Sequence, residues 1–261
     1  MHKLFRWFAR CGESYVHAYL SRIDVRRLAI DRTYGLKLFL FVWAYERNGA
    51  PRAYRIAAVK AVSSLNGSVR HLADRFEKFR AKKLNPKANP ALDPRIGAID
   101  IPAVVRLVRT GALEEAFSKL AIRGVGHKLR AFFLRDLVTL LKSESNLDRN
   151  PQTYLWCQPI DVWVRVAAEE LCHGIVDPAP RGWGRFGLSR ADRVAAWGLV
   201  QLALDARVSP LRVNQGIWYF SSNVVADEPR LRSLLRRGDP HQLAAELALM
   251  KGFLPARPTW G

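Results

Sequence analysis

The sequence predicts an all-α protein, and three observations support this class. Apolar residues recur with helical period through nearly all of the 261 residues. No segment shows a convincing alternation of apolar and polar residues, the pattern typical of a strand. Serine and proline stand where helices start, as at Ser209-Pro210, where serine caps and proline fills the first helical position. We expect two helical lobes.

In the N-terminal half, two adjoining helices are expected over 15–23 and 24–46. Pro51 suits the first turn of the next helix, which Asn66-Gly67 ends. Ser68 then caps a basic helix that extends to about residue 84. The following stretch holds four prolines before residue 103, which indicates a loop or an internal linker.

In the C-terminal half, a tight turn at 123–127 leads into a helix that extends to about residue 142. The polar stretch 143–158 and the Gly/Pro/Arg-rich stretch 177–187 are predicted to be loops. Further helices are expected over 103–109, 113–120, 159–172 and 189–206, from 210 onward, and over 230–236 and 241–251.

The charge of the chain is the first indication of function. It carries 42 Lys and Arg against 23 Asp and Glu, a net charge of +19, and 49% hydrophobic residues exclude general disorder. Such an excess on a folded chain attracts a polyanion, usually nucleic acid. No apolar run approaches the ~18 residues of a membrane span, and Arg6 and Arg10 interrupt what would be a secretory signal.

The cysteines and histidines predict no metal site and no cofactor. Cys11, Cys157 and Cys172 lack the spacing of zinc ligands and are too few for a four-cysteine iron–sulfur cluster. The six histidines are scattered. We therefore expect a cytoplasmic protein in a reducing compartment, with no membrane association.

The most informative motif is a predicted hairpin between two helices. Gly124, Val125 and Gly126 turn the chain sharply, and the glycines allow close approach to the backbone. The next helix then starts at His127 with unpaired N–H groups, which favour a phosphate. An ordinary helix–turn–helix corner is the alternative.

Lys128 follows in the first turn of that helix. A cation is unfavourable there because the helix dipole is positive at this end, and the same field, with partial burial, would lower the lysine pKa. A neutral amine at pH 7 is a nucleophile that forms Schiff bases. A solvent-facing lysine that contacts a phosphate is the alternative.

Asp161 lies 33 residues after Lys128, at the start of a helix opened by Pro159. Its carboxylate suits that position electrostatically, so a helix cap is one interpretation. The other is chemical, because an amine and a carboxylate that meet in one cleft can perform displacement chemistry.

These residues give the chain a resemblance to the helix–hairpin–helix DNA glycosylases. Gly-Val-Gly-His-Lys up to Lys128, followed by Pro-Ile-Asp-Val around Asp161, is similar to the catalytic pair of the bifunctional members, and the match covers roughly 113–171. The Lys-to-Asp interval is most like that of the archaeal-type 8-oxoguanine glycosylases. The resemblance implies a two-lobed fold with the active site in the cleft between lobes, one formed by 1–100 with 189–261 and the other by 101–188.

The resemblance also implies a pocket for the damaged base. Phe132 stands where that branch places an aromatic residue one turn after the lysine, and Asn214 and Trp218 look like its acidic residue and stacking tryptophan. Core packing is the alternative for both aromatic residues. Asn214 departs from the pattern because it is an amide, and Arg130 because the hairpin usually has a small residue there.

The function implied is a bifunctional base-excision repair glycosylase with AP lyase activity that removes 8-oxoguanine from duplex DNA through a lysine Schiff base. Gly124, Val125, Gly126 and His127 would contact the backbone, and the hairpin carbonyls can hold a monovalent cation. The protein would be a monomer associated with the nucleoid. The alternatives are a non-catalytic helical DNA-binding protein and a glycosylase for another damaged base, such as a monofunctional enzyme for alkylated bases.

Overall fold

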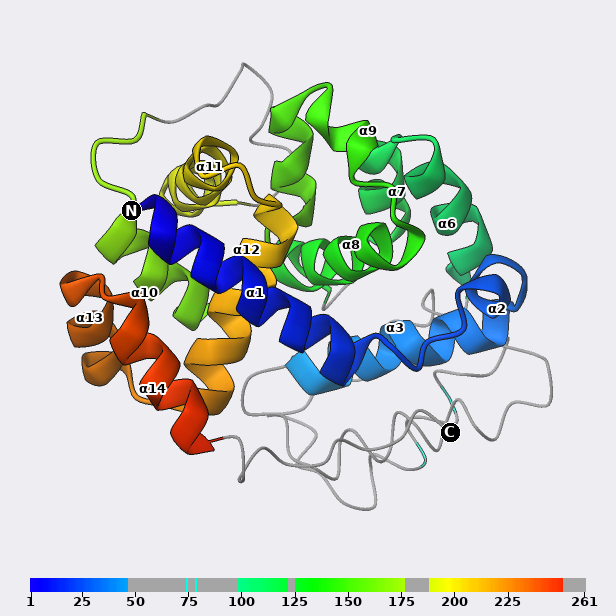
Figure 1. The fold of residues 1–261 in the computed structure, drawn as a ribbon. Coiled ribbons are helices and arrows are strands. Elements are labelled where there is room, and N and C mark those ends of the chain that lie inside the picture. The colour runs from blue at the N-terminus through cyan, green and yellow to red at the C-terminus, as the bar shows by residue number, and fades with distance from the viewer. Residues whose placement is uncertain (47–73, 75–77, 79–97, 122–124, 177–187, 251–261) are drawn as a thin grey trace. The chain divides into compact units, whose positions relative to one another are not determined.

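A computed structural model describes residues 1–46, 74, 78, 98–121, 125–176 and 188–250. The regular structure of these residues is helical, and they contain no β-strand (Figure 1). The all-α class is therefore confirmed for the described part of the chain. The predicted helices between 51 and 84 and the loop over 177–187 fall almost wholly outside it.

The helices group into two compact units. Unit 2 comprises residues 24–146, whereas unit 1 combines 1–23 with 147–261. The helices of unit 2 are α2 (Val25–Ile30), α3 (Arg32–Glu46), α6 (Ile101–Arg109), α7 (Leu113–Lys119) and α8 (His127–Leu141). Those of unit 1 are α1 (His2–Tyr19), the 3-10 helix η2 (Pro151–Cys157), α10 (Val162–Leu171), α11 (Arg190–Asp205), α12 (Pro210–Phe220), the π-helical turn η4 (Ser221–Val225), α13 (Glu228–Arg237) and α14 (Pro240–Met250). The short α9 (Ser145–Asp148) crosses the boundary.

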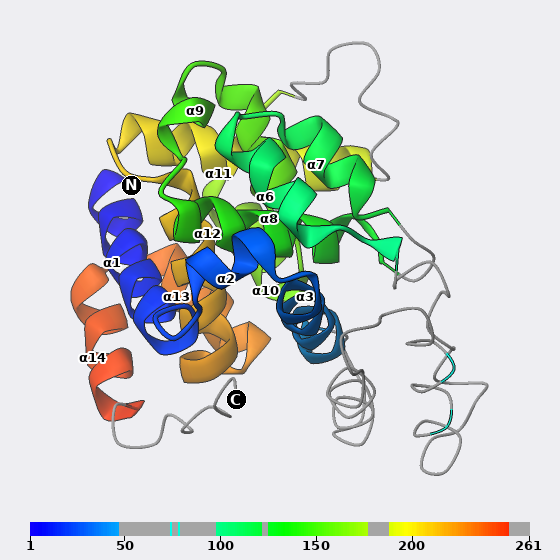
Figure 2. The same cartoon turned by 90° about the vertical axis from the view of Figure 1, so that its right-hand side faces the viewer.

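This division differs from the lobes expected from the sequence. Helices α2 and α3 group with α6 and α8 because α2 packs on α6 and α3 packs on both α6 and α8, as Figure 2 shows. Helix α10 groups with the C-terminal helices because it packs on α11, α12 and α13. The two units therefore meet in the sequence between residues 23 and 24 and between residues 146 and 147.

The core of unit 1 is built on the contact between α1 and α12 (Figure 1). The two backbones approach closely at two glycines, since a Cβ added to Gly216 would overlap the carbonyl oxygen of Phe8, and one added to Gly12 would overlap that of Arg212. Only glycine permits this separation. Around the crossing, α1 buries a continuous apolar face made of Leu4, Phe5, Trp7, Phe8, Cys11, Tyr15 and Tyr19.

Helix α1 therefore begins thirteen residues before the predicted start at residue 15. A second difference is a break in the predicted helix over 24–46. The Asp31 carboxylate accepts a hydrogen bond from the Tyr34 backbone N–H at 2.9 Å and pairs with Arg27 at 2.9 Å. It thereby caps a new helix where the sequence pattern predicts continuation.

The stretch 143–158 is helical rather than a loop. It contains α9 and η2, and Asn150 caps η2 by accepting a hydrogen bond from the Gln152 N–H at 3.3 Å, with Pro151 in the first turn. The helix predicted over 159–172 begins later, at Val162. The predicted caps Ser189 and Ser209 are confirmed, because each side chain accepts an N–H of its own helix.

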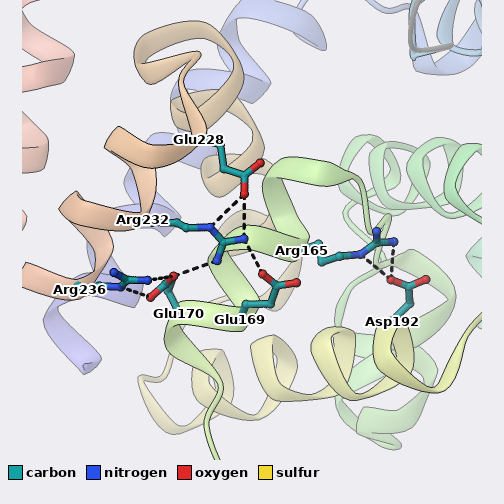
Figure 3. A network of polar contacts seen from close by, with 7 residues as sticks. All are labelled: Arg165, Glu169, Glu170, Asp192, Glu228, Arg232 and Arg236. Carbon is teal, nitrogen blue, oxygen red and sulfur yellow. Dashed lines mark hydrogen bonds and ion pairs between the residues drawn. The ribbon is translucent and has the colours of Figure 1, made fainter.

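A network of ion pairs joins α10 to α13 in unit 1 (Figure 3). Arg232 contacts Glu169 at 2.7 Å and Glu170 and Glu228 at 2.9 Å. Arg236 contacts Glu170 at 2.8 Å. Hydrogen bonds from Arg236 and Arg232 lower the pKa of the Glu170 carboxyl below its usual value of 4.5. Since α10 begins beside Asp161, this network helps to fix the helix that carries the predicted carboxylate.

We expect Arg232→Gln to lower the Tm by a few degrees at low salt, because a network of surface ion pairs contributes only modestly to the free energy of unfolding. Because the folded pKa of Glu170 is depressed, its contribution is present above pH 4.5 and is lost as the pH falls through the folded value. The Tm difference should thus shrink as the pH falls below 4.5 and through the depressed folded pKa, and it should also shrink in high salt. Arg165→Gln, which removes the single pair with Asp192, should cost less, and equal losses would contradict the network.

Candidate functional site

The candidate hairpin lies in unit 2, at the start of α8. Gly124 is outside the described residues. Val125 is buried, and Gly126 precedes α8 with φ −75° and ψ −178°, a conformation open to any residue. A Cβ at Gly126 would meet nothing within 4 Å. Gly126 is thus not needed for the turn itself, but it leaves open space above the backbone where α8 begins.

The start of α8 has no side-chain cap, because Gly126 offers no acceptor. The first backbone bond of the helix runs from the Arg130 N–H to the Gly126 carbonyl at 3.3 Å. Amides that precede this bond point along the helix axis, in the geometry that suits an anion. Lys128 lies among them with its side chain half-buried.

The His127 side chain packs inside unit 2. The residue is 7% exposed, and its ring lies against Phe117 of α7, with centroids 5.0 Å apart. The Arg130 guanidinium also covers Phe117, at 4.0 Å from the ring centre. The His127 ring therefore belongs to the packing between α7 and α8, and a contribution of His127 to phosphate binding stays a prediction.

Arg130 stands out in this packing. Burial lowers the pKa of its guanidinium, and its buried Nε has no hydrogen-bond partner within the described residues. The sequence marks Arg130 only as a departure from the family pattern. Arg130 lies two residues after Lys128 near the start of α8, so it is a second cation in this part of the chain.

Phe132 is buried, and the Arg135 guanidinium lies 4.3 Å from the centre of its ring. Arg135 is itself fully buried and pairs with Asp136 at 3.0 Å. Phe132 is therefore part of the packing of α8, and its role in a base pocket stays a prediction.

Asp161 lies in unit 1, where it is the N-cap of α10. Its Oδ1 accepts a hydrogen bond from the Val164 N–H at 2.9 Å, and its side chain is half-buried. The cap orients the carboxylate at the start of the helix, which is the structural interpretation considered above. Lys128 belongs to unit 2, so the predicted pair is divided between the two units.

Two buried amides hold the segment that leads into Asp161. The Asn214 Nδ2 donates to the Pro159 carbonyl at 3.3 Å, and the Gln158 Nε2 donates to the Pro210 carbonyl at 3.5 Å. Both side chains are fully buried, and the Gln158 Oε1 has no partner in the described part of the chain. The structure thus brings Asn214 to the Asp161 segment, and it adds Gln158, which sequence reasoning missed.

Trp218 is 6% exposed and lies in an aromatic cluster of unit 1. Tyr15 and Tyr19 of α1 meet it edge to face, at centroid distances of 5.8 and 5.9 Å. Trp218 lies one helical turn after Asn214 on α12. Its packing agrees with the core interpretation, and stacking on a base stays a prediction.

Comparison of the chain with family models, curated proteins and solved structures finds no match. None of the described helices combines the length and apolar character needed to cross a bilayer. Within the same residues, no three His, Cys, Asp or Glu side chains gather in an arrangement that could hold a metal ion.

Proposed function

We propose that this protein is a bifunctional DNA glycosylase and AP lyase that removes 8-oxoguanine from duplex DNA. The observation that carries the proposal is the start of α8, where a half-buried lysine lies in a helix turn without a side-chain cap. Gly126 leaves open space beside it. The net charge of +19 supports a polyanionic substrate.

In the proposed reaction, the damaged base leaves the duplex, and the side chains proposed to contact it are Phe132 of unit 2 and Asn214 and Trp218 of unit 1. The Lys128 amine attacks C1′ of the sugar, the glycosidic bond breaks, and the base departs. Asp161 accepts the lysine proton or stabilises the positive charge that develops on the sugar. The C1′–O4′ bond of the sugar then breaks, O4′ takes up a proton, and C1′ and the lysine nitrogen form the Schiff base. Loss of a C2′ proton from the Schiff base breaks the C3′–O3′ bond, and the 3′ strand leaves with a 5′-phosphate.

Borohydride trapping on three duplexes tests this proposal. The duplexes carry 8-oxoguanine, an abasic site or no damage. Covalent complexes with the first two, and none with the third, are expected. A complex with the abasic duplex alone would retain the lyase chemistry and direct the search to another lesion. Binding without any trapping would favour a non-catalytic protein or a monofunctional glycosylase.

The second candidate, a non-catalytic DNA-binding protein, is favoured by one observation. The rings of His127 and Trp218 are buried against neighbouring aromatic residues, as core residues are. Such a protein would bind phosphate at the hairpin without chemistry. It predicts unaltered behaviour when the charge of Asp161 is removed.

Asp161→Asn separates these alternatives. Asparagine caps helices as well as aspartate does, so α10 should start normally and DNA binding should persist. Removal of a charge that acts in the transition state should slow base release at least about 100-fold in single-turnover assays. Asp161→Ala, which removes the cap as well, should in addition lower the Tm. Unaltered turnover in Asp161→Asn would remove this carboxylate from the mechanism.

A further inference from the structure

Unit 1 contains a basic pocket of about 820 Å³ between α1 and the turn that joins α13 to α14. Asp239 is the single acidic residue among the described residues that line it. The cations that give the pocket its basic character are Lys3, Arg6 and Arg10 from α1 and Arg237 from the end of α13.

The contact between α1 and α12 holds the three α1 cations in a row. With the apolar face of α1 buried, positions 3, 6 and 10 fall on its exposed side at helical spacing. Lys3 and Arg10 are seven residues apart, or about 10 Å along the axis. Because the phosphates of one DNA strand advance by about 3.4 Å each, the row spans more than one of them.

Carboxylates do not neutralise this row. Lys3 and Arg10 make no ion pair within the described residues, and the Arg6 Nε donates to the Ala206 carbonyl at 3.2 Å, which leaves its charge unpaired. Asp239 accepts the His241 N–H at 2.9 Å and forms no ion pair with Lys3, Arg6 or Arg10 within the described residues. Burial raises the pKa of the Cys11 thiol to about 12, so it adds no negative charge.

The contrast with the rest of α13 is informative. Arg230, Arg232 and Arg236 each pair with glutamates. Arg237, on the same helix, instead faces the pocket and donates to the neutral Gln242 at 3.5 Å. The cations that line the pocket are therefore those that the acidic side chains of this region leave available.

We propose that this pocket binds linked phosphate groups, with the backbone of a DNA strand as its ligand. Arginine forks and lysine ammonium groups hold phosphate oxygens by charge-assisted hydrogen bonds. The site is a binding site that acts whether or not Lys128 forms a Schiff base. A free polyphosphate, such as that of a nucleotide, presents the same chemistry and is the other source to distinguish.

The test compares the double variant Lys3→Gln/Arg10→Gln with the control Arg22→Gln/Arg149→Gln. Both remove two exposed cations from unit 1, and the control residues lie outside the pocket. Fluorescence anisotropy measures the affinity of the full chain for an undamaged duplex between 50 and 200 mM salt. Calorimetry measures the binding of tripolyphosphate. Circular dichroism confirms that both variants fold.

We expect the pocket variant to lose about tenfold in DNA affinity and to reduce the salt slope by about 2, close to one counterion for each contact. The control should change much less. If only tripolyphosphate binding is lost, the pocket binds a free polyphosphate instead of a DNA strand. Equal changes in both variants, with tripolyphosphate binding unaltered or undetectable, would overturn the proposal. Because the duplex is undamaged, none of these results depends on glycosylase activity.

Discussion

Lys128→Gln is expected to abolish both base release and borohydride trapping. The amide cannot form an imine, so no covalent complex with 8-oxoguanine or abasic duplexes should appear even after long incubation. The half-buried position of Lys128 at the start of α8 means that the replacement, similar in length and able to donate, should leave the helix intact. Gel separation of the trapped complex measures the effect directly.

Two further variants distinguish a nucleophilic role of Lys128 from a role in phosphate contact. Lys142→Gln removes the same charge from the other end of α8, where the side chain is exposed, and should trap normally. Lys128→Arg keeps the positive charge but replaces the amine by a guanidinium that stays protonated. If Lys128 only contacts a phosphate, Lys128→Arg should retain function. Near-normal trapping by Lys128→Gln would refute the assignment of the nucleophile.

The second large effect is expected at Gly216. In an ordinary helix interior, alanine is more stable than glycine by about 1 kcal/mol. Here the added methyl group would overlap the Phe8 carbonyl oxygen, so α1 and α12 would have to separate along the contact that forms the core of unit 1. We expect Gly216→Ala to lower the free energy of unfolding by about 3 kcal/mol and the Tm by about 6–12 °C.

Gly126→Ala is the matched control, because its new methyl group meets nothing within 4 Å and its φ of −75° suits alanine. Thermal unfolding followed by circular dichroism should show little change for Gly126→Ala. A Gly216→Ala variant as stable as the wild type would show that the two helices separate at little cost. The two variants also separate an effect on stability, expected at Gly216, from an effect on DNA binding, expected only at Gly126, because only Gly126 borders the start of α8.

The sequence predicts helices well where a local signal starts them. Ser189 and Ser209 cap the helices they were expected to cap, because the hydroxyl group and its N–H partner lie within one turn. Asp31 carries the same kind of signal, but the apolar pattern continues through it, and the break depends on its bonds to Tyr34 and Arg27. The early start of α1 was missed because its arginines interrupt a linear apolar run, although they lie on one side of a helix.

In the candidate site, too, some residues can be predicted from the sequence and others cannot. Lys128 and Asp161 can be found from sequence because both stand at helix starts in short motifs. Gln158 cannot, because its importance rests on burial and on its bond to the Pro210 carbonyl, which lies 52 residues away. The basic pocket also escapes sequence reasoning, because it combines residues from the two ends of the described chain.

The contact between Phe8 and Gly216 has a consequence for how the chain folds during synthesis. At 5–20 residues per second, a ribosome needs roughly 10–40 s to proceed from the first of these residues to the second. Unit 2 is continuous, so its helices can pack against one another during that interval. The apolar face of α1 must wait for α12, and until then it is a surface that chaperones can bind and on which nascent chains can associate.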